Sequence, residues 1–399
     1  MGDESLNRQV FDVVVIGAGP AGCAAARTLA RAGWNVGIFD KDYFPREKTC
    51  GDALVPDAHQ ALDRLGLRDR VQKIAYPAAE FRLISYNGIE LALRGATACV
   101  QRIELDTLLL SAAQELGAHF FPGHLFKSVK EVEGQQSEVE FVFGDERVVV
   151  SAPWVILATG ANAHSIKQAG LLERRKPSGF AVRRYVKNPR MATQLKQLVF
   201  ILDHSVAGGY GWIFPLGDDV FNVGIGYFKD VSEIGSLRRD FEKFIARQPL
   251  VKEVMRDAEI LSPLKGSPLR TGLTGARISR EGVLATGECI GSTFPLSGEG
   301  IGKALETGII VAESLLSHSS EGRDAVATIY AERIAALKPK YEGYRKAEIL
   351  LRRPWVTNFL IARAKNNDYL HSKVEALFNE TLDLSKLYSL KTLKRLFFN

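Results

Sequence analysis

The residues from Phe11 to Asp40 contain a glycine pattern that few folds can accommodate. FDVVVI at 11–16 is rich in β-branched residues, as expected for a buried parallel strand, and G-A-G-P-A-G follows at 17–22. The alanine-rich stretch 21–32 predicts a helix that ends at Gly33, and 35–39 predicts a second short strand. This order of strand, glycine-rich turn, helix and strand predicts a dinucleotide-binding βαβ unit.

Each glycine of the pattern has its own physical role. Gly17 allows the tight turn, Gly19 lets the backbone approach a pyrophosphate, and Gly22 lets the helix pack closely on the strand. The start of the helix offers free N–H groups and a positive dipole to phosphates. Asp40 lies 23 residues after Gly17, where a carboxylate can bind ribose hydroxyls. Because an acid there disfavours a 2′-phosphate, the pattern does not predict an NADP site.

A second motif lies far downstream. GVLAT at 282–286 predicts a short strand that runs into Gly287-Glu288-Cys289, and G-E-G-I-G at 298–302 opens a predicted helix to about Ser314. This motif resembles the second FAD fingerprint of the flavoprotein family that includes aromatic hydroxylases, halogenases and geranylgeranyl reductases. The resemblance implies that the acid after the strand binds the ribityl chain of FAD and that the helix N-terminus faces the flavin pyrimidine ring. The family usually has aspartate at this position, whereas this chain has Glu288.

Three further segments carry the same resemblance. WVILATG at 154–160 is similar to the strand that returns to the adenosine side, and Arg102 is similar to an arginine that meets the FAD. Arg102 could instead cap surface structure. Lys48-Thr49-Cys50-Gly51 resembles the K-x-C-G signature of geranylgeranyl reductases. The FAD-binding residues that the resemblance implies are Gly17, Gly19, Pro20, Ala21, Gly22, Asp40, Lys41, Lys48, Cys50, Gly51, Arg102, Thr159, Gly160, Gly287, Glu288, Pro295, Gly298, Gly300 and Ile301.

An aromatic motif, Y-G-W-I-F-P at 210–215, resembles a second geranylgeranyl reductase signature. Tyr210, Trp212 and Phe214 are spaced by two, so on a strand they point to one face. With Cys50 they are the candidate catalytic residues, and we expect them to line an apolar cavity over the flavin. The alternatives are an ordinary sheet core and a buried, inert thiol. The first tryptophan of the halogenase motif W-x-W-x-I-P is replaced by Tyr210, so halogenation is not expected.

Three functions are compatible with these motifs. The first is an FAD-dependent oxidoreductase that reduces C=C bonds of an isoprenoid or another apolar substrate. The second is a flavin monooxygenase, which would use a C4a-hydroperoxide to hydroxylate an aromatic molecule or a protein side chain. The third is a flavoprotein that acts mainly as a maturation partner. The D-G pair that helps hydroxylases bind nicotinamide is absent from 160–164, so NAD(P)H, a partner reductase and ferredoxin all remain candidate electron donors.

The motifs predict an α/β fold with a Rossmann-like FAD-binding domain of the glutathione-reductase or aromatic-hydroxylase type. We expect this domain to be discontinuous and to comprise 9–78, 98–165 and 268–340. Residues 79–97 and 166–267 should form an antiparallel sheet, the substrate domain, because LVFIL at 198–202 is an apolar run and 221–227 alternates. Residues 341–399 are expected to be helical, with a break at Pro354.

Composition constrains partners and location. The formal net charge is +6, and residues 341–399 contain 11 Lys and Arg against 6 Asp and Glu. The basic, apolar end at 387–399 could lie on a membrane surface, bind a client protein, or pack as a terminal helix. The four cysteines are scattered, which argues against a metal site or a disulfide framework. With no signal peptide or transmembrane segment apparent, we expect a cytoplasmic protein, peripheral at the membrane if the tail binds, with no nucleic-acid partner.

Overall fold

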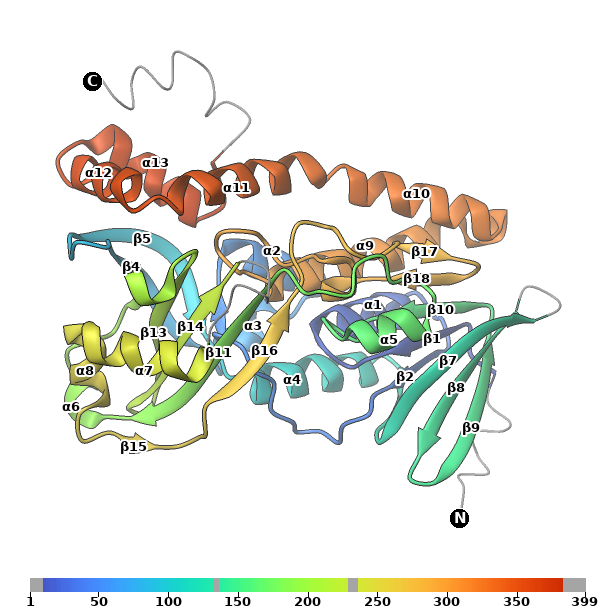
Figure 1. The fold of residues 1–399 in the computed structure, drawn as a ribbon. Coiled ribbons are helices and arrows are strands. Elements are labelled where there is room, and N and C mark those ends of the chain that lie inside the picture. Colours follow the sequence, from blue (N-terminus) through green and yellow to red (C-terminus); the bar gives the residue numbers. More distant parts are fainter. Residues whose placement is uncertain (1–9, 133–135, 229–235, 383–399) are drawn as a thin grey trace.

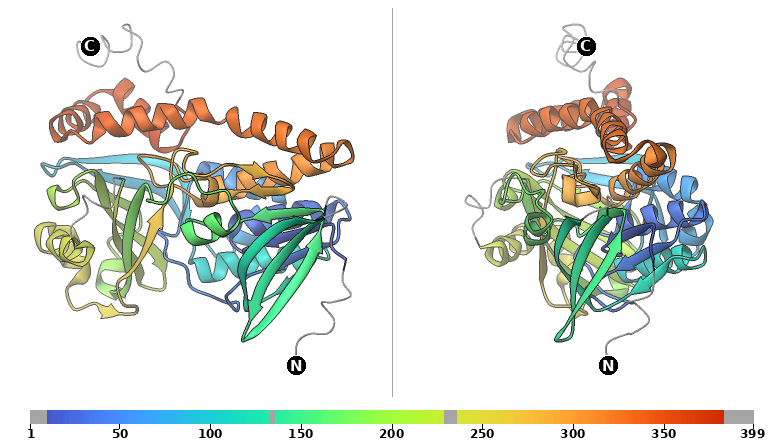
Figure 2. Two further views of the ribbon diagram at one scale, coloured as in Figure 1. Left: turned by 45° about the vertical axis from the view of Figure 1, so that its right-hand side comes forward. Right: turned by 90° about the vertical axis from the view of Figure 1, so that its right-hand side faces the viewer.

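A computed structural model describes residues 10–132, 136–228 and 236–382 of the chain (Figure 1). Two sheets lie at opposite ends of the molecule, and helices α10 to α13 run along one side of both (Figure 1, Figure 2). A small three-stranded sheet lies beside the end that contains α1 (Figure 1). The architecture is the α/β fold that the sequence predicts.

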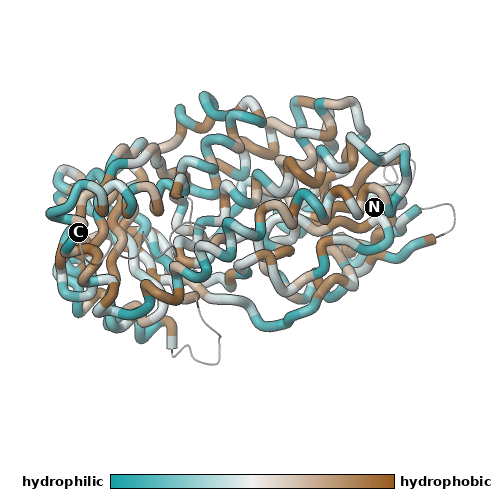
Figure 3. The backbone as a smooth tube through the Cα atoms, turned by 90° about the horizontal axis from the view of Figure 1, so that it is seen from above, coloured by the Kyte–Doolittle hydropathy of each residue, from teal (hydrophilic) through white to brown (hydrophobic). Residues whose placement is uncertain are grey.

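The first sheet has six strands in the order β17-β18-β10-β1-β2-β6. Their bounds are β1 Val13–Ile16, β2 Val36–Phe39, β6 His119–Phe121, β10 Trp154–Leu157, β17 Ser279–Arg280 and β18 Val283–Ala285. All pairs are parallel except β17 with β18. Strands β1, β2, β10 and β18 are buried throughout, which explains their apolar sequences. Figure 3 shows hydrophobic stretches of the backbone at both ends of the molecule. Because the strand order reverses direction at β1, a crevice opens at the carboxyl ends of the strands there.

Three helices pack against this sheet and against each other. They are α1 Pro20–Arg31, α4 Arg102–Gln114 and α9 Ile301–His318. Helix α1 begins one residue before the predicted start, and α9 continues four residues beyond the predicted end at Ser314. A side chain at Gly308 of α9 would fall on the carbonyl oxygen of Ala21 in α1. The two helices that carry the glycine motifs therefore approach closely, although Gly22 and Ile301 lie 279 positions apart in the sequence.

The second sheet has nine strands in the order β15-β11-β14-β13-β12-β4-β5-β3, with β16 also paired to β11. Their bounds are β3 Ala53–Leu54, β4 Tyr76–Ile84, β5 Glu90–Cys99, β11 Gly179–Lys187, β12 Leu198–Ile201, β13 Gly209–Gly217, β14 Val220–Tyr227, β15 Glu259–Ile260 and β16 Lys265–Leu269. The expectation of an antiparallel sheet was wrong at one place, because β12 and β4 pair in parallel. These strands come from segments far apart in the chain, and such pairing leaves no local signal in the sequence.

The expected domain boundaries at 78, 97 and 267 cut through β4, β5 and β16. The reason is that β4 and β5 stay paired on both sides of a register irregularity between Ala78 and Glu80, and that β16 pairs with β11 along its whole length. The residue composition alone does not mark where one of these strands ends.

Helices α7 Leu237–Arg247 and α8 Pro249–Met255 cover one face of the nine-stranded sheet, and Phe244 lies directly against Gly211 of β13.

The remaining elements connect or extend these layers. The three-stranded sheet is antiparallel and contains β7 His124–Val132, β8 Gln136–Phe143 and β9 Glu146–Ala152. The short helices are α2 Pro56–Leu65, α3 Arg68–Gln72, α5 Ala163–Gln168 and α6 Pro189–Ala192. The C-terminal helices are α10 Arg323–Ala335, α11 Lys338–Leu351, α12 Pro354–Ala364 and α13 Asp368–Phe378. Pro354 is the first residue of α12, as expected for a break, and the basic end 387–399 lies outside the described residues.

No helix in the described ranges is both long and apolar enough to cross a bilayer.

The contact between α1 and α9 gives a testable prediction. In a helix interior, Gly→Ala normally stabilises by about 1 kcal/mol. Gly308→Ala should instead destabilise, by roughly 1–3 kcal/mol, because the methyl group would fall on the Ala21 carbonyl and push the helices apart. Urea unfolding would measure this, with Leu316→Ala on the exposed face of α9 as a near-neutral control. A more stable Gly308→Ala protein would contradict the close packing.

Candidate functional site

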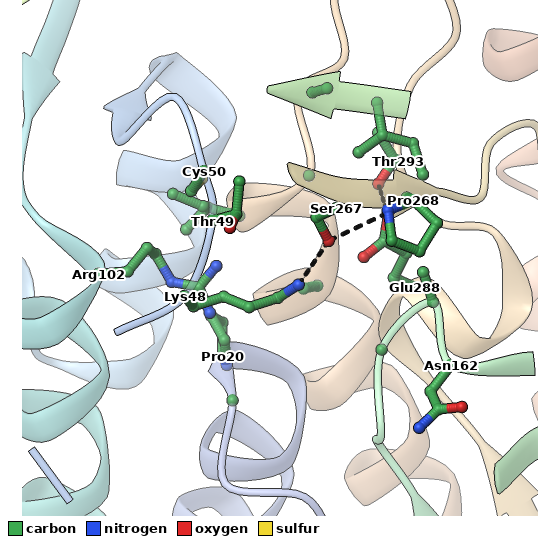
Figure 4. A pocket seen from close by; sticks show the side chains of 18 of the residues that line it. Pro20, Lys48, Thr49, Cys50, Arg102, Asn162, Ser267, Pro268, Glu288 and Thr293 are labelled. Atoms are coloured by element: carbon green, nitrogen blue, oxygen red, sulfur yellow. Dashed lines mark hydrogen bonds between the residues drawn. The ribbon is translucent and has the colours of Figure 1, made fainter. Parts of the chain in front are cut away.

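One large cavity lies between the two sheets, with a volume of about 950 Å³. It extends from Asp40 at the end of β2 to the aromatic side chains of β13 and to Phe378 at the end of α13. Segments from every part of the chain line it, including the loops after β1, β2, β10 and β18 (Figure 4). The carboxyl ends of the parallel strands therefore open into the same space as the face of the second sheet.

The glycine-rich turn forms one end of this cavity. Gly17 has a φ of 107°, a left-handed conformation that favours glycine, and its Cα faces the Ala158 carbonyl of the neighbouring loop. A side chain at Gly19 would meet nothing nearer than Arg46 Nη2 at 3.8 Å, so the space beside Gly19 is open. Gly19 is the N-cap of α1 and makes no side-chain cap, which leaves backbone N–H groups facing this space. A pyrophosphate fits this arrangement.

Asp40 lies at the end of β2 and lines the cavity, as expected. Its carboxylate accepts hydrogen bonds from the backbone N–H groups of Ala18, at 2.7 Å, and Asp42, at 2.9 Å. Burial raises the pKa of Asp40 above its ordinary value, and the hydrogen bond from Ala18 opposes that shift. The side chain is therefore held rigidly at the turn, in the position where the sequence predicts a ribose contact.

Most of the other predicted FAD-binding residues line the same cavity. These are Gly17, Pro20, Ala21, Lys41, Lys48, Cys50, Gly51, Arg102, Thr159, Gly160, Glu288, Gly298, Gly300 and Ile301. Gly22, Gly287 and Pro295 are not among the residues that line it. Gly22 packs against the Gly17 carbonyl and Val15, so it sets the spacing between α1 and β1, and Gly287 packs against the Ala21 side chain of α1. That these residues contact FAD stays a prediction.

Lys48 and Glu288 approach each other across the middle of the cavity (Figure 4). Lys48 Nζ donates a hydrogen bond to Ser267 Oγ at 2.9 Å, and Glu288 Oε1 accepts one from the Arg270 N–H at 3.2 Å. Burial lowers the pKa of Lys48 and raises the pKa of Glu288, and the attraction between the two charges opposes both shifts. Glu288, whose side chain is longer than aspartate, is therefore hydrogen-bonded to the backbone of Arg270.

A buried ionic group supports the loop that carries Lys48 and Cys50. Arg102 makes two hydrogen bonds to the Asp106 carboxylate, both 2.7 Å, and Arg46 Nη1 lies 3.1 Å from the same carboxylate. Arg102 is 8% exposed, so the alternative of a surface cap does not describe it. Two arginines on one carboxylate leave net positive charge beside the open space at Gly19, which suits a bound phosphate.

The aromatic strand forms the other end of the cavity. Tyr210, Trp212 and Phe214 all line it and lie in contact along one face of β13, with Trp212 and Phe214 stacked at 6.0 Å between ring centroids. Phe200 of β12 and Phe378 extend this wall, and sequence analysis missed both. Phe200 lies in the LVFIL run and could have been noticed there, whereas nothing in the sequence marks Phe378.

The two polar groups of this wall are satisfied away from the cavity centre. The Tyr210 hydroxyl donates to the Ser297 carbonyl, and Trp212 Nε1 donates to Asn222 Oδ1 at 2.9 Å. The wall therefore presents ring carbon to whatever occupies the cavity. Cys50 lines the same space, and burial raises the pKa of its thiol, so it is held neutral at physiological pH.

A buried carboxyl group that sequence analysis did not select lies behind Cys50. Asp52 has no exposed surface, and its Oδ2 accepts hydrogen bonds from Tyr185 Oη at 2.7 Å and Asn222 Nδ2 at 2.8 Å. Its φ of 67° is left-handed, a conformation that favours glycine. Burial raises its pKa to about 6, and the hydrogen bonds from Tyr185 and Asn222 oppose that shift. The same Asn222 amide also donates to the Cys50 carbonyl at 2.8 Å.

The C-terminal segment is joined to the cavity by a second buried ionic group. Lys303 of α9 lies 2.7 Å from Asp57 Oδ2 and 3.7 Å from Glu380 Oε2, and Glu380 lines the cavity. Burial raises the pKa of Glu380 to about 8, with the charge of Asp57 adding to the shift. The ammonium group already compensates these acids, so the cluster holds residue 380 against α9.

Comparison with known proteins agrees with this geometry. A family model described as "FAD binding domain" matches residues 10–213, and a second, "Geranylgeranyl reductase catalytic domain", matches 180–264. A menaquinone reductase of Mycolicibacterium smegmatis is 31% identical over 341 residues, with 77% of this chain and 76% of the relative covered. The chain belongs to the geranylgeranyl reductase branch of the FAD-dependent flavoproteins. The protein is therefore an FAD-dependent oxidoreductase, and the cavity that Gly19 and Glu288 line is the predicted site for FAD.

Other known proteins are also similar to this chain in sequence or in fold. Digeranylgeranylglycerophospholipid reductase 2 of Methanopyrus kandleri is 29% identical over 306 residues, covering 76% of each chain. A geranylgeranyl bacteriochlorophyll reductase-like protein of Thermoplasma acidophilum has the same fold, with a TM-score of 0.72 at 21% identity over 97% of this chain and 96% of that one. The flavin-dependent halogenase CmlS also shares the fold, with a TM-score of 0.69 at 23% identity over 84% of this chain and 63% of that one.

The space at Gly19 predicts how FAD binding can be blocked. Gly19→Val should reduce FAD affinity at least about tenfold, because the side chain fills the place of the pyrophosphate without striking the protein. FAD content from absorbance at purification, and flavin fluorescence titration, would measure this. The thermal denaturation of flavin-free wild-type and variant protein should match, and a variant that retains FAD fully would show that the phosphates bind elsewhere.

Asp52 predicts a pH dependence of stability. Its pKa of about 6 in the folded protein lies above the ordinary aspartate value of 3.8, so the folded state binds the proton more tightly than the unfolded state. Stability from this group is fully present below about pH 4 and is lost as pH rises through 6, by roughly 3 kcal/mol in total. Asp52→Asn keeps the hydrogen-bond acceptor and tolerates a left-handed φ, but it cannot titrate.

Urea unfolding of both proteins at several pH values between 4 and 7 would test this prediction. The stability of the wild type relative to Asp52→Asn should fall as pH rises. A difference that is constant across this range, or that grows with pH, would show that Asp52 is ionised throughout.

Proposed function

We propose that this protein reduces C=C bonds of an isoprenoid or another long apolar substrate. The observation that carries the proposal is the wall of Tyr210, Trp212 and Phe214, which faces the same cavity as the FAD-binding turn and offers only ring carbon. A substrate with polar groups along its length would lose hydrogen bonds with water there and gain none. A hydrocarbon chain loses nothing and gains about 25 cal/mol for each Å² of apolar surface buried.

The names of the relatives support an apolar substrate. One family member is called a menaquinone reductase and another a digeranylgeranylglycerophospholipid reductase. Both names specify reduction of a molecule with an isoprenoid chain. The second family model, which matches residues 180–264 and so includes β12 to β14, is described as a geranylgeranyl reductase catalytic domain.

Bound FAD supplies hydride chemistry when it is reduced. The residues of this chain would position the substrate and exclude water. Trp212 and Phe214 would hold the chain against the flavin side of the cavity, and the bond from Tyr210 to the Ser297 carbonyl fixes the wall to the loop before α9. The electron donor stays a prediction from sequence, either NAD(P)H or a partner reductase, and so does the client-protein alternative.

The proposal can be tested without knowing the donor. Holoenzyme reduced with dithionite under anaerobic conditions should saturate a prenyl chain of menaquinone or of a geranylgeranyl lipid presented in detergent, with product detected by mass spectrometry. Turnover only after oxygen is admitted, with labelled oxygen in the product, would instead identify a monooxygenase.

Phe214→Ala tests the role of the wall in the same assay. Removal of this ring should lower kcat/KM for the apolar chain roughly 10- to 100-fold, mainly through KM, because about 1.5–3 kcal/mol of apolar contact is lost. FAD content must be measured alongside, since Phe214 also lies near Gly51. An unchanged kcat/KM with normal FAD content would show that the wall is sheet core and does not hold substrate.

A further inference from the structure

The outer surface of the C-terminal helices is unusually apolar. Five of the thirteen large apolar side chains that are exposed among the described residues belong to α11–α13. Four of them lie between 349 and 359, at the corner where α11 passes into α12: Ile349, Leu350, Trp355 and Phe359. Trp355 is 64% exposed and Ile349 is 52% exposed. We call these four residues the corner patch.

The corner patch is surrounded by positive charge. Residues 349–367 contain four basic residues and no acidic one: Arg352, Arg353, Arg363 and Lys365. On the preceding turn of α11, Arg345 and Lys346 are exposed beside Ile349. The nearest acid, Glu348, is largely buried and already paired with Arg352. Exposed tryptophan and phenylalanine among arginines are the combination that binds the interface of an anionic bilayer.

Helix α12 has a second, inner face that packs in the apolar cluster behind the aromatic wall. Ile361 and Ala364 pack in the same apolar cluster as Trp212 and Phe214, and so do Leu370 and Phe378 of α13. A single layer of helices therefore separates the corner patch from the aromatic wall. Figures 1 and 2 show this layer lying over β4 and β5 on the side of the molecule away from the β7–β9 sheet.

We propose that the corner patch docks the protein on the surface of an anionic membrane. The positive charge attracts the lipid headgroups, and the four apolar side chains insert below them. A second copy of this chain is a poorer occupant, because a two-fold contact would place like charges opposite each other. If the substrate is a membrane lipid, which rests on the function proposed above, docking would place the bilayer against the helices that close the cavity.

Vesicle binding of the full-length holoprotein tests this directly. Wild-type protein should co-sediment with vesicles of equal phosphatidylglycerol and phosphatidylcholine, bind less at high salt, and bind pure phosphatidylcholine weakly. The double variant Trp355→Ser, Phe359→Ser should bind anionic vesicles about tenfold more weakly. Arg352→Gln, Arg353→Gln should lose the preference for phosphatidylglycerol.

Matched controls exist elsewhere on the chain. Ile260→Ser, Leu261→Ser removes two exposed apolar side chains at the end of β15 and directly after it, and Arg238→Gln, Arg239→Gln removes two exposed charges on α7. Both controls should bind as the wild type does. Because every variant keeps 383–399, a contribution from the basic end is the same in all of them. Far-ultraviolet circular dichroism and FAD content would confirm that each variant is folded.

Three results would overturn the proposal. Wild-type protein that fails to bind anionic vesicles is the first, and full binding by the Trp355→Ser, Phe359→Ser variant is the second, since another surface would then be the anchor. The third is a dimer of the wild-type protein in analytical ultracentrifugation together with a monomer of the Trp355→Ser, Phe359→Ser variant. This result would show that a second copy of the chain covers the corner patch. The binding assay needs no turnover, so a failure of C=C reduction in detergent would reject the proposed function and leave this result intact.

Discussion

The close packing of α1 on α9 is the contact on which the site depends. Glycines make it possible, because a side chain at Gly308 would fall on Ala21 and one at Gly287 would meet the same residue. Both helices begin at the cavity, so their packing brings two positive dipole ends into one space. An extended dinucleotide carries a negative pyrophosphate at one end and an electron-rich ring at the other. Each of these groups is stabilised by the positive end of a helix.

Several charges are buried around that space, and each has a partner that compensates its desolvation. Asp106 lies between two arginines, Lys48 lies near Glu288, and Lys303 lies near Asp57 and Glu380. Such groups are expensive to bury for stability alone. Their concentration around one cavity indicates that they position loops for a ligand, and it explains why segments from 46 to 380 must assemble before the site exists.

The aromatic strand shows that core and cavity are not exclusive alternatives. Trp212 and Phe214 are each 4% exposed and belong to an apolar cluster, yet they also line the cavity. The same cluster continues through α12 and α13 to the surface that carries Trp355. The apolar interior therefore extends from the flavin side of the cavity to the outer helices, which is consistent with an apolar substrate.

The sequence by itself determined the βαβ unit, the FAD cofactor and the common face of Tyr210, Trp212 and Phe214, because these depend on local spacing and on motifs of contiguous residues. Only the tertiary structure decided the parallel pairing of β4 with β12, the burial of Asp52 against Tyr185 and Asn222, and the entry of Phe378 into the cavity. Those contacts join residues more than a hundred positions apart. Their partners are chosen by packing and by the need to satisfy buried polar groups, and neither leaves a periodic signal along the chain.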